Sequence, residues 1–195
     1  KRDIALLGRV PCIGDACVTV LDVSLDRNRD ALLALLQCGA QVDDFDHHYA
    51  ADVPLHAGLR AHLSGDAQVC TSMLVDRFLG GAHRAWAVAG AYGDNLCETA
   101  GRLAASLAEP AARIGALREL GECLNYNAYG DSEADLFIAP ADLYRRMRRH
   151  ADPWRFMEQE PVLAEIRDGR ARDLAMAQQL RPWTVFAHGV VYMLP

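Results

Sequence analysis

The residues best suited to chemistry lie in the short segment 41–48. It carries three carboxylates and two imidazoles within six positions: Asp43, Asp44, Asp46, His47 and His48. Carboxylates at this density repel one another and take up protons unless a cation lies among them. Carboxylate and imidazole groups are also common ligands of divalent metals. The segment therefore predicts half of a metal site, with either Asp43 or Asp44 solvated or paired with an arginine instead.

The elements around this segment predict a parallel sheet. Residues 17–23 are rich in β-branched side chains, which indicates a buried strand near Asp22. A helix capped by Asp26 is expected next, and residues 41–45 then predict a second strand. A strand, a helix and a strand within about 30 residues is typical of a right-handed parallel βαβ unit. Because ligands bind outside the carboxyl ends of parallel strands, Asp22 and Asp46 are expected at one edge.

A further carboxylate follows an apolar segment rich in small residues, 86–94. Asp94 stands at its far end, on what is expected to be another strand end, after a glycine that permits close backbone approach. Residues 52–66 form a polar connection. Helical spacing is expected over 69–79, 96–107, 110–126, 140–150 and 160–180, with a new strand over 183–194. The predicted fold class is α/β, a parallel βαβ sheet core followed by a mainly helical region.

Composition limits the class of protein. The 195 residues are 51% hydrophobic and 24% charged, with a net charge of -6, so a strongly basic nucleic-acid-binding surface is not expected. No apolar run is long enough to span a membrane, and no signal-like segment follows the N-terminus, which favours a cytoplasmic protein. The six cysteines form no C-x-x-C pair and are expected to be reduced and buried.

Three motifs occur in order along the chain. They are Val20-Leu21-Asp22, Asp46-His47-His48 and Ala91-Tyr92-Gly93-Asp94. Together they resemble the motifs of the DHH (Asp-His-His) phosphoesterase superfamily, which includes RecJ-type exonucleases, oligoribonucleases, cyclic-dinucleotide phosphodiesterases, pyrophosphatases and exopolyphosphatases. Three motifs in the right order are far more specific than a lone Asp-His-His.

The resemblance covers about residues 17–95 and implies a domain plan. A DHH-type α/β catalytic core is expected over 1–95, a helical region over 96–181, and a linker with the start of a second lobe over 182–195. The family's first motif, an Asp-rich turn after a strand, is not found in residues 1–16. The resemblance thus implies a core that lacks its N-terminal part and the C-terminal DHHA1-type lobe. Such a chain could lack the ligands of one metal and be inactive by itself.

The same resemblance implies a role for each motif residue. Asp22 would bridge two Mn²⁺ ions, while His47 and Asp94 would be ligands of one of them. His48 would contact a substrate phosphate, which makes Asp22, His47, His48 and Asp94 the catalytic set. Asp46 would orient a metal-binding histidine. Mg²⁺ or Co²⁺ could replace Mn²⁺, and the two ions would activate a water for in-line attack on phosphorus.

One basic cluster lies in residues 144–150 and contains four arginines. Arg146 and Arg149 are candidates for binding substrate phosphates through their guanidinium groups. A solvated face near a helix C-terminus, where cations are favourable, explains the cluster equally well. Both interpretations stay open at the level of sequence.

The expected function is that of a Mn-dependent phosphoesterase of the phosphodiesterase or exonuclease type. Its partner would be a phosphorylated small molecule or a short single-stranded nucleic acid, with no membrane involved and a homodimer left open. One alternative is a pyrophosphatase or exopolyphosphatase acting on phosphoanhydrides. The other is a non-catalytic nucleotide-binding or regulatory module that senses a phosphorylated ligand.

Overall fold

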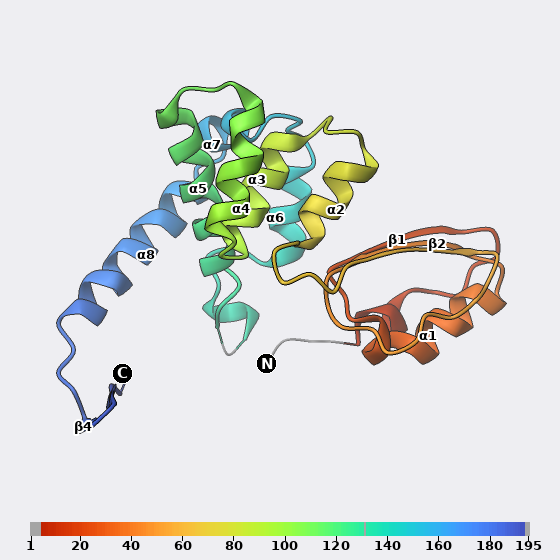
Figure 1. The fold of residues 1–195 in the computed structure, drawn as a ribbon, viewed down its shortest axis with the longest axis horizontal. Coiled ribbons are helices and arrows are strands. Elements are labelled where there is room, and N and C mark those ends of the chain that lie inside the picture. The colour runs from red at the N-terminus through yellow and green to blue at the C-terminus, as the bar shows by residue number, and fades with distance from the viewer. Residues whose placement is uncertain (1–4, 131, 194–195) are drawn as a thin grey trace.

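A three-stranded sheet and a helical region make up the chain (Figure 1). The computed structural model describes residues 5–130 and 132–193. A short 3-10 helix, η1 (Leu6–Arg9), precedes the sheet, and the part that follows the sheet is mainly helical. The predicted α/β fold class is confirmed.

The sheet is parallel throughout. Its strands are β1 (Cys17–Leu21), β2 (Gln41–Asp46) and β3 (Leu59–Leu63), in the order β1-β2-β3. Helix α1 (Leu25–Gln37) connects β1 to β2, which confirms the predicted βαβ unit. Strand β3 forms within the segment expected to be only a polar connection. It was missed because its exposed Arg60 and Ala61 break the apolar pattern of a buried strand.

One face of the sheet packs against α1. Leu32 and Leu36 of this helix are buried in the same cluster as Val20 and Val42 of the sheet. Strand β1 was expected to be buried, but only Val20 is, because β1 is an edge strand covered by a helix on one side.

The start of α1 differs from the prediction. Ser24 occupies the N-cap position and Asp26 lies inside the first turn. The Asp26 carboxylate accepts a hydrogen bond from the backbone N–H of Ala51 and another from Arg29. Asp26 is therefore not the N-cap. The chain turns immediately after β1, at Asp22 (φ 60°), so that α1 begins at Leu25, one residue before Asp26.

A helical region follows the sheet. Its largest buried side chains include Phe156, Leu117, Leu120 and Ile166. The elements are α2 (Thr71–Phe78), α3 (Arg84–Gly93), α4 (Cys97–Ala104), η2 (Ala105–Leu107), α5 (Ala111–Tyr126), η3 (Glu133–Asp135), α6 (Pro140–Met147), α7 (Pro153–Gln159) and α8 (Val162–Gln178).

Residues 86–94 are a correction. They belong to α3 and its C-cap, so Asp94 follows a helix rather than a strand. The segment is rich in alanine, the residue with the highest helix propensity. The small side chains that suggested a buried strand instead let α3 pack closely against its neighbours.

That close approach is greatest where α3 meets α5. A side chain at Gly121 of α5 would overlap the carbonyl oxygen of Ala89 and come within 2.7 Å of the Gly93 nitrogen. A side chain at Gly93 would come within 2.9 Å of the Gly121 carbonyl oxygen. The two glycines thus allow backbone contact between the helices, one residue before Asp94.

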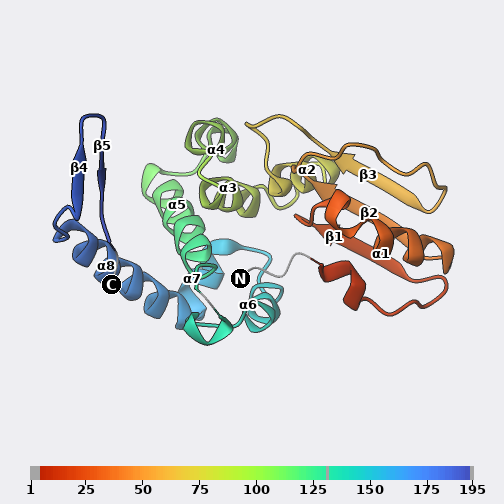
Figure 2. The ribbon, with the colours of Figure 1, turned by 90° about the horizontal axis from the view of Figure 1, so that it is seen from below.

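The C-terminal part extends away from the other helices. Residues 171–178 of α8 are exposed, and a hairpin of β4 (Thr184–Phe186) and β5 (Gly189–Val191) follows (Figure 2). The strand expected over 183–194 is thus two short antiparallel strands.

The cysteines only partly follow the prediction. Cys12 and Cys38 form a disulfide, Cys17 and Cys97 are exposed thiols, and the remaining two are buried thiols. The pair was missed because the two residues are far apart in sequence and meet only when the segment before β1 lies along α1. Within the described part of the chain, no helix is long and apolar enough to cross a membrane.

We predict that Gly121→Ala lowers the free energy of unfolding by about 1–3 kcal/mol, because the added methyl group forces α3 and α5 apart. Urea unfolding followed by circular dichroism measures the change. Gly115→Ala is the matched control on the same helix, since nothing lies within 4 Å of the added carbon. That control should raise stability by up to about 1 kcal/mol. Equal effects of the two substitutions would contradict the close contact.

Candidate metal centre

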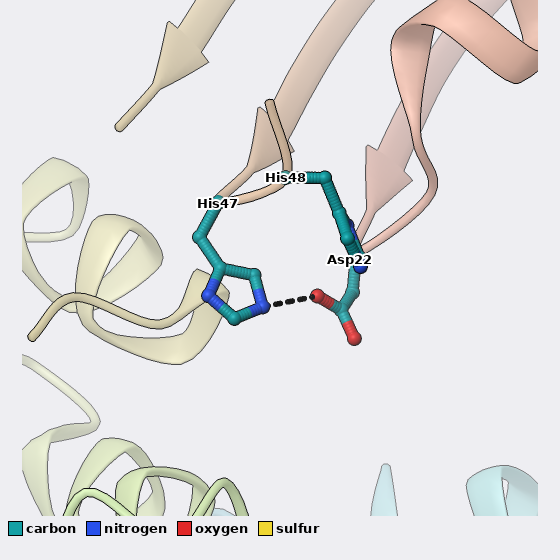
Figure 3. A group of neighbouring side chains, drawn as sticks. All are labelled: Asp22, His47 and His48. Carbon is teal, nitrogen blue, oxygen red and sulfur yellow. Dashed lines mark ion pairs between the residues drawn. The ribbon is translucent and has the colours of Figure 1, made fainter. Parts of the chain in front are cut away.

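The candidate site lies at the carboxyl ends of β1 and β2 (Figure 3). Asp22 follows the last residue of β1, and Asp46 ends β2 just before His47 and His48. The parallel register pairs Leu21 with Phe45, and the backbone N–H of Asp22 donates to the Phe45 carbonyl at 3.0 Å. The expectation that Asp22 and Asp46 share one edge of the sheet is confirmed.

Asp22 is held by its backbone and by a neighbouring hydroxyl. Its φ of 60° lies in the left-handed region, which aspartate tolerates better than most residues. The hydroxyl of Thr71, the first residue of α2, donates to Asp22 Oδ1 at 2.9 Å. Because Thr71 is buried, this contact fixes the direction of a carboxylate that is itself more than half exposed.

His47 is the centre of the cluster. Its Nδ1 lies 3.1 Å from the carbonyl oxygen of Val69. Its Nε2 lies 3.3 Å from Asp22 Oδ1 and 3.7 Å from Asp94 Oδ2. A carbonyl oxygen can only accept, so Nδ1 is the nitrogen that carries a hydrogen. Nε2 then faces two carboxylates, an arrangement that a cation between the three groups would stabilise.

Asp46 is buried under the two histidines. Its Oδ1 accepts the backbone N–H of His47 at 2.9 Å and lies 2.7 Å from His48 Nδ1. Only 1% of Asp46 is exposed, so these contacts are not shared with solvent. His48 is thereby held through Nδ1, and its Nε2 is left for a ligand. The role expected for Asp46, orienting a histidine, stays a prediction that these contacts support.

The structure brings the other three catalytic candidates around the imidazole of His47. Asp22, His47 and His48 each offer one ligand atom within 4.8 Å of the others. Asp94 is outside that group and reaches His47 from the end of α3. Figure 3 shows the His47 ring pointing at Asp22, with His48 beside the same carboxylate. Three carboxylates or imidazoles from two strand ends and a fourth from a helix end therefore converge.

The basic candidates lie elsewhere. Arg146 of α6 forms an ion pair with Glu160 at 3.2 Å, which gives it a structural partner. Arg149 follows the same helix and is exposed. Across the described residues, neither forms a hydrogen bond or ion pair with the four catalytic candidates.

Two parts of the site were not found from sequence. The Thr71 hydroxyl and the Val69 carbonyl both come from the start of α2 and the turn before it. Residues 69–79 gave only a helical pattern, and a backbone carbonyl has no sequence signal at all. A threonine at the expected start of a helix is usually interpreted as a cap.

The two carboxylates of β2 that precede the motif have different surroundings. Asp43 pairs with Arg60 on the exposed side of the sheet, as expected for one of the two. Asp44 is 1% exposed, and its Oδ1 has no hydrogen-bond partner within the described residues. Burial, and to a lesser extent the nearby charge of Asp46, raise the pKa of Asp44 to about 6.

Comparisons with protein-family models, curated proteins and solved structures gave no match.

The raised pKa of Asp44 predicts a pH-dependent stability. The folded chain holds this proton more tightly than the unfolded chain, so the stabilisation is complete below about pH 4 and is lost as the pH rises through about 6. The loss is on the order of 2 to 3 kcal/mol. Urea unfolding at pH 4.5 and pH 7 should show a smaller difference for Asp44→Asn than for the unchanged chain. Asp30→Asn, at an exposed position on α1, is the control and should leave the difference unchanged.

Proposed function

We propose that this chain is a metal-dependent phosphoesterase of the Asp-His-His type. Its substrate would be a phosphodiester bond in a nucleotide or a short oligonucleotide. The observation that carries the proposal is the environment of His47, whose Nδ1 is held by a carbonyl while Nε2 faces Asp22 and Asp94. Metal-binding histidines are oriented in this way, with the second ring nitrogen donating to a fixed acceptor.

The donors fit a divalent cation. Asp22, His47 and Asp94 would hold the ion, and an imidazole with two carboxylates suits Mn²⁺, with Mg²⁺ or Co²⁺ as substitutes. A cation between the three groups would balance the charges of the Asp22 and Asp94 carboxylates, which both lie near His47 Nε2. The complete centre would hold two ions, which would lower the pKa of a bound water and neutralise charge on phosphoryl oxygens.

The chain's own residues would position the substrate beside this centre. His48 is held by Asp46 at one nitrogen, and its side chain is half exposed, so the other nitrogen can donate to a phosphate oxygen. The Asp22 and Asp94 side chains are also about half exposed. A phosphorylated ligand can therefore reach the metal ligands from solvent without a rearrangement of the sheet.

We place the protein in the cytoplasm, because two of its cysteines are exposed thiols. The Cys12–Cys38 disulfide is the observation that runs against this assignment.

Substitution of the proposed ligands tests the function directly. We predict that His47→Ala and Asp94→Ala each abolish Mn²⁺ binding in titration calorimetry and Mn²⁺-dependent release of nucleotides from a short oligonucleotide. His83→Ala, an exposed histidine at the start of α3, should behave like the unchanged chain. Unchanged Mn²⁺ affinity in both ligand variants would refute the centre. If the chain hydrolysed pyrophosphate but not the oligonucleotide, the same centre would be that of a phosphoanhydride hydrolase.

The hydroxyl that orients Asp22 provides a subtler test. Thr71→Val keeps the shape of the side chain but removes the hydrogen bond to Asp22 Oδ1. We expect Mn²⁺ affinity to fall about tenfold, as is usual for a residue that supports a metal ligand. Thr99→Val is the control, because Thr99 is also buried and hydrogen-bonded but contacts Gln68 and Arg102 instead. Equal affinities of the two variants would remove Thr71 from the site.

A further inference from the structure

A second candidate site is a pocket at the junction of α6 and α7. It has a volume of about 770 Å³ and is lined by a single stretch of chain, from Arg149 to Glu160. Its charged lining residues are Arg149, Asp152, Arg155 and Glu160, with His150 beside them. None of these residues belongs to the candidate metal centre.

The negative groups of the pocket already have partners. Glu160 Oε2 accepts a hydrogen bond from the Arg146 guanidinium at 3.2 Å, and Glu160 Oε1 lies 3.4 Å from His150 Nε2. The Asp152 Oδ1 accepts the backbone N–H of Trp154 at 2.8 Å, where it caps α7. Both carboxylates are thus engaged within the fold.

The two arginines that line the pocket differ from its carboxylates in their contacts. Arg149 and Arg155 are exposed, and within residues 5–130 and 132–193 neither guanidinium forms a hydrogen bond or ion pair. Two free guanidiniums facing one hollow are suited to an anion with several oxygens, because each presents a planar fork of donors.

The backbone that carries Arg149 is fixed rather than loose. Trp86 Nε1 of α3 donates to the carbonyls of His150 and Ala151, at 3.2 and 3.1 Å. The His150 ring packs edge-on against Phe156, which is fully buried. A fixed wall reduces the entropy lost when the arginines order around a ligand.

We propose that this pocket binds a phosphate group through Arg149 and Arg155. Its position suggests which phosphate. Trp86 lies in the first turn of α3, and Asp94 follows the last, so about 12 Å of helix axis separates the residue that holds the pocket wall from the residue that reaches the metal centre. A phosphate bound here belongs to a part of the substrate remote from the bond that is cleaved. Assignment to a substrate strand rests on the function proposed above, but phosphate binding itself does not.

A single-stranded oligonucleotide several nucleotides long is the substrate class that fits a phosphate site separate from the metal centre. The other source of the same chemistry is free inorganic phosphate, and the experiment separates the two.

The test measures binding in EDTA, so that the metal centre makes no contribution and its failure would not affect the result. The full chain is titrated with a ten-nucleotide single strand by fluorescence anisotropy, and with inorganic phosphate by NMR. Arg149→Ala and Arg155→Ala should each weaken both ligands about fivefold to tenfold. The double variant should lower the salt slope of oligonucleotide binding by about 2. Arg148→Ala is the matched control, an exposed neighbour outside the pocket, and should change neither affinity by more than about twofold.

Each outcome is decisive. Equal weakening by Arg148→Ala and Arg149→Ala would show diffuse charge and overturn the pocket, as would the absence of binding to both ligands by the unchanged chain. Loss confined to inorganic phosphate would overturn the assignment to a nucleic-acid strand. Arg149→Lys should retain most of the salt slope while losing affinity, since lysine keeps the charge but not the planar fork.

Discussion

The contact between His47 Nδ1 and the carbonyl of Val69 is the interaction on which the site depends. It fixes which ring nitrogen is turned toward Asp22 and Asp94. If the ring turned over, the carboxylates would lose the group that links them, and the repulsion between their charges would be unrelieved. The turn before α2 therefore governs the chemistry of a cluster that is supplied mainly by the sheet. Thr71, at the start of the same helix, adds a second contact of this kind by holding Asp22.

Two separate structural units supply the acidic groups. The parallel pairing of β1 and β2 places Asp22 beside the end of β2. The contact of Gly93 with Gly121 places the end of α3, and so Asp94, against the helical region. The site lies where the sheet and the helices meet, so a change in the packing of α3 on α5 would move one carboxylate relative to the others. Through Trp86, the same helix also holds the wall of the pocket at the junction of α6 and α7. Helix α3 therefore connects the two proposed sites.

Two buried carboxylates of β2 differ in how well their charges are compensated. Asp46 is compensated by two donors, whereas Asp44, two residues earlier on β2, has an oxygen without a hydrogen-bond partner within the described chain. Its raised pKa, about 6, shows that burial near another carboxylate opposes ionisation. Such buried, imperfectly compensated charge is typical of functional sites, where stability is lost to keep groups in place.

The sequence by itself determined the βαβ unit and the meeting of Asp22 with the Asp-His-His segment. Strand period, helix length and the edge rule of parallel sheets are local or general properties, so they can be inferred from residue types and spacing. Tertiary structure alone decided that Asp94 arrives from a helix, that Thr71 supports Asp22, and that Arg146 is paired with Glu160. These contacts join residues from separate elements, and their geometry follows from how the elements pack, which no local pattern records. The alanine-rich segment favours a helix by propensity, and the close contact of Gly93 with Gly121 places the end of that helix, which carries the carboxylate.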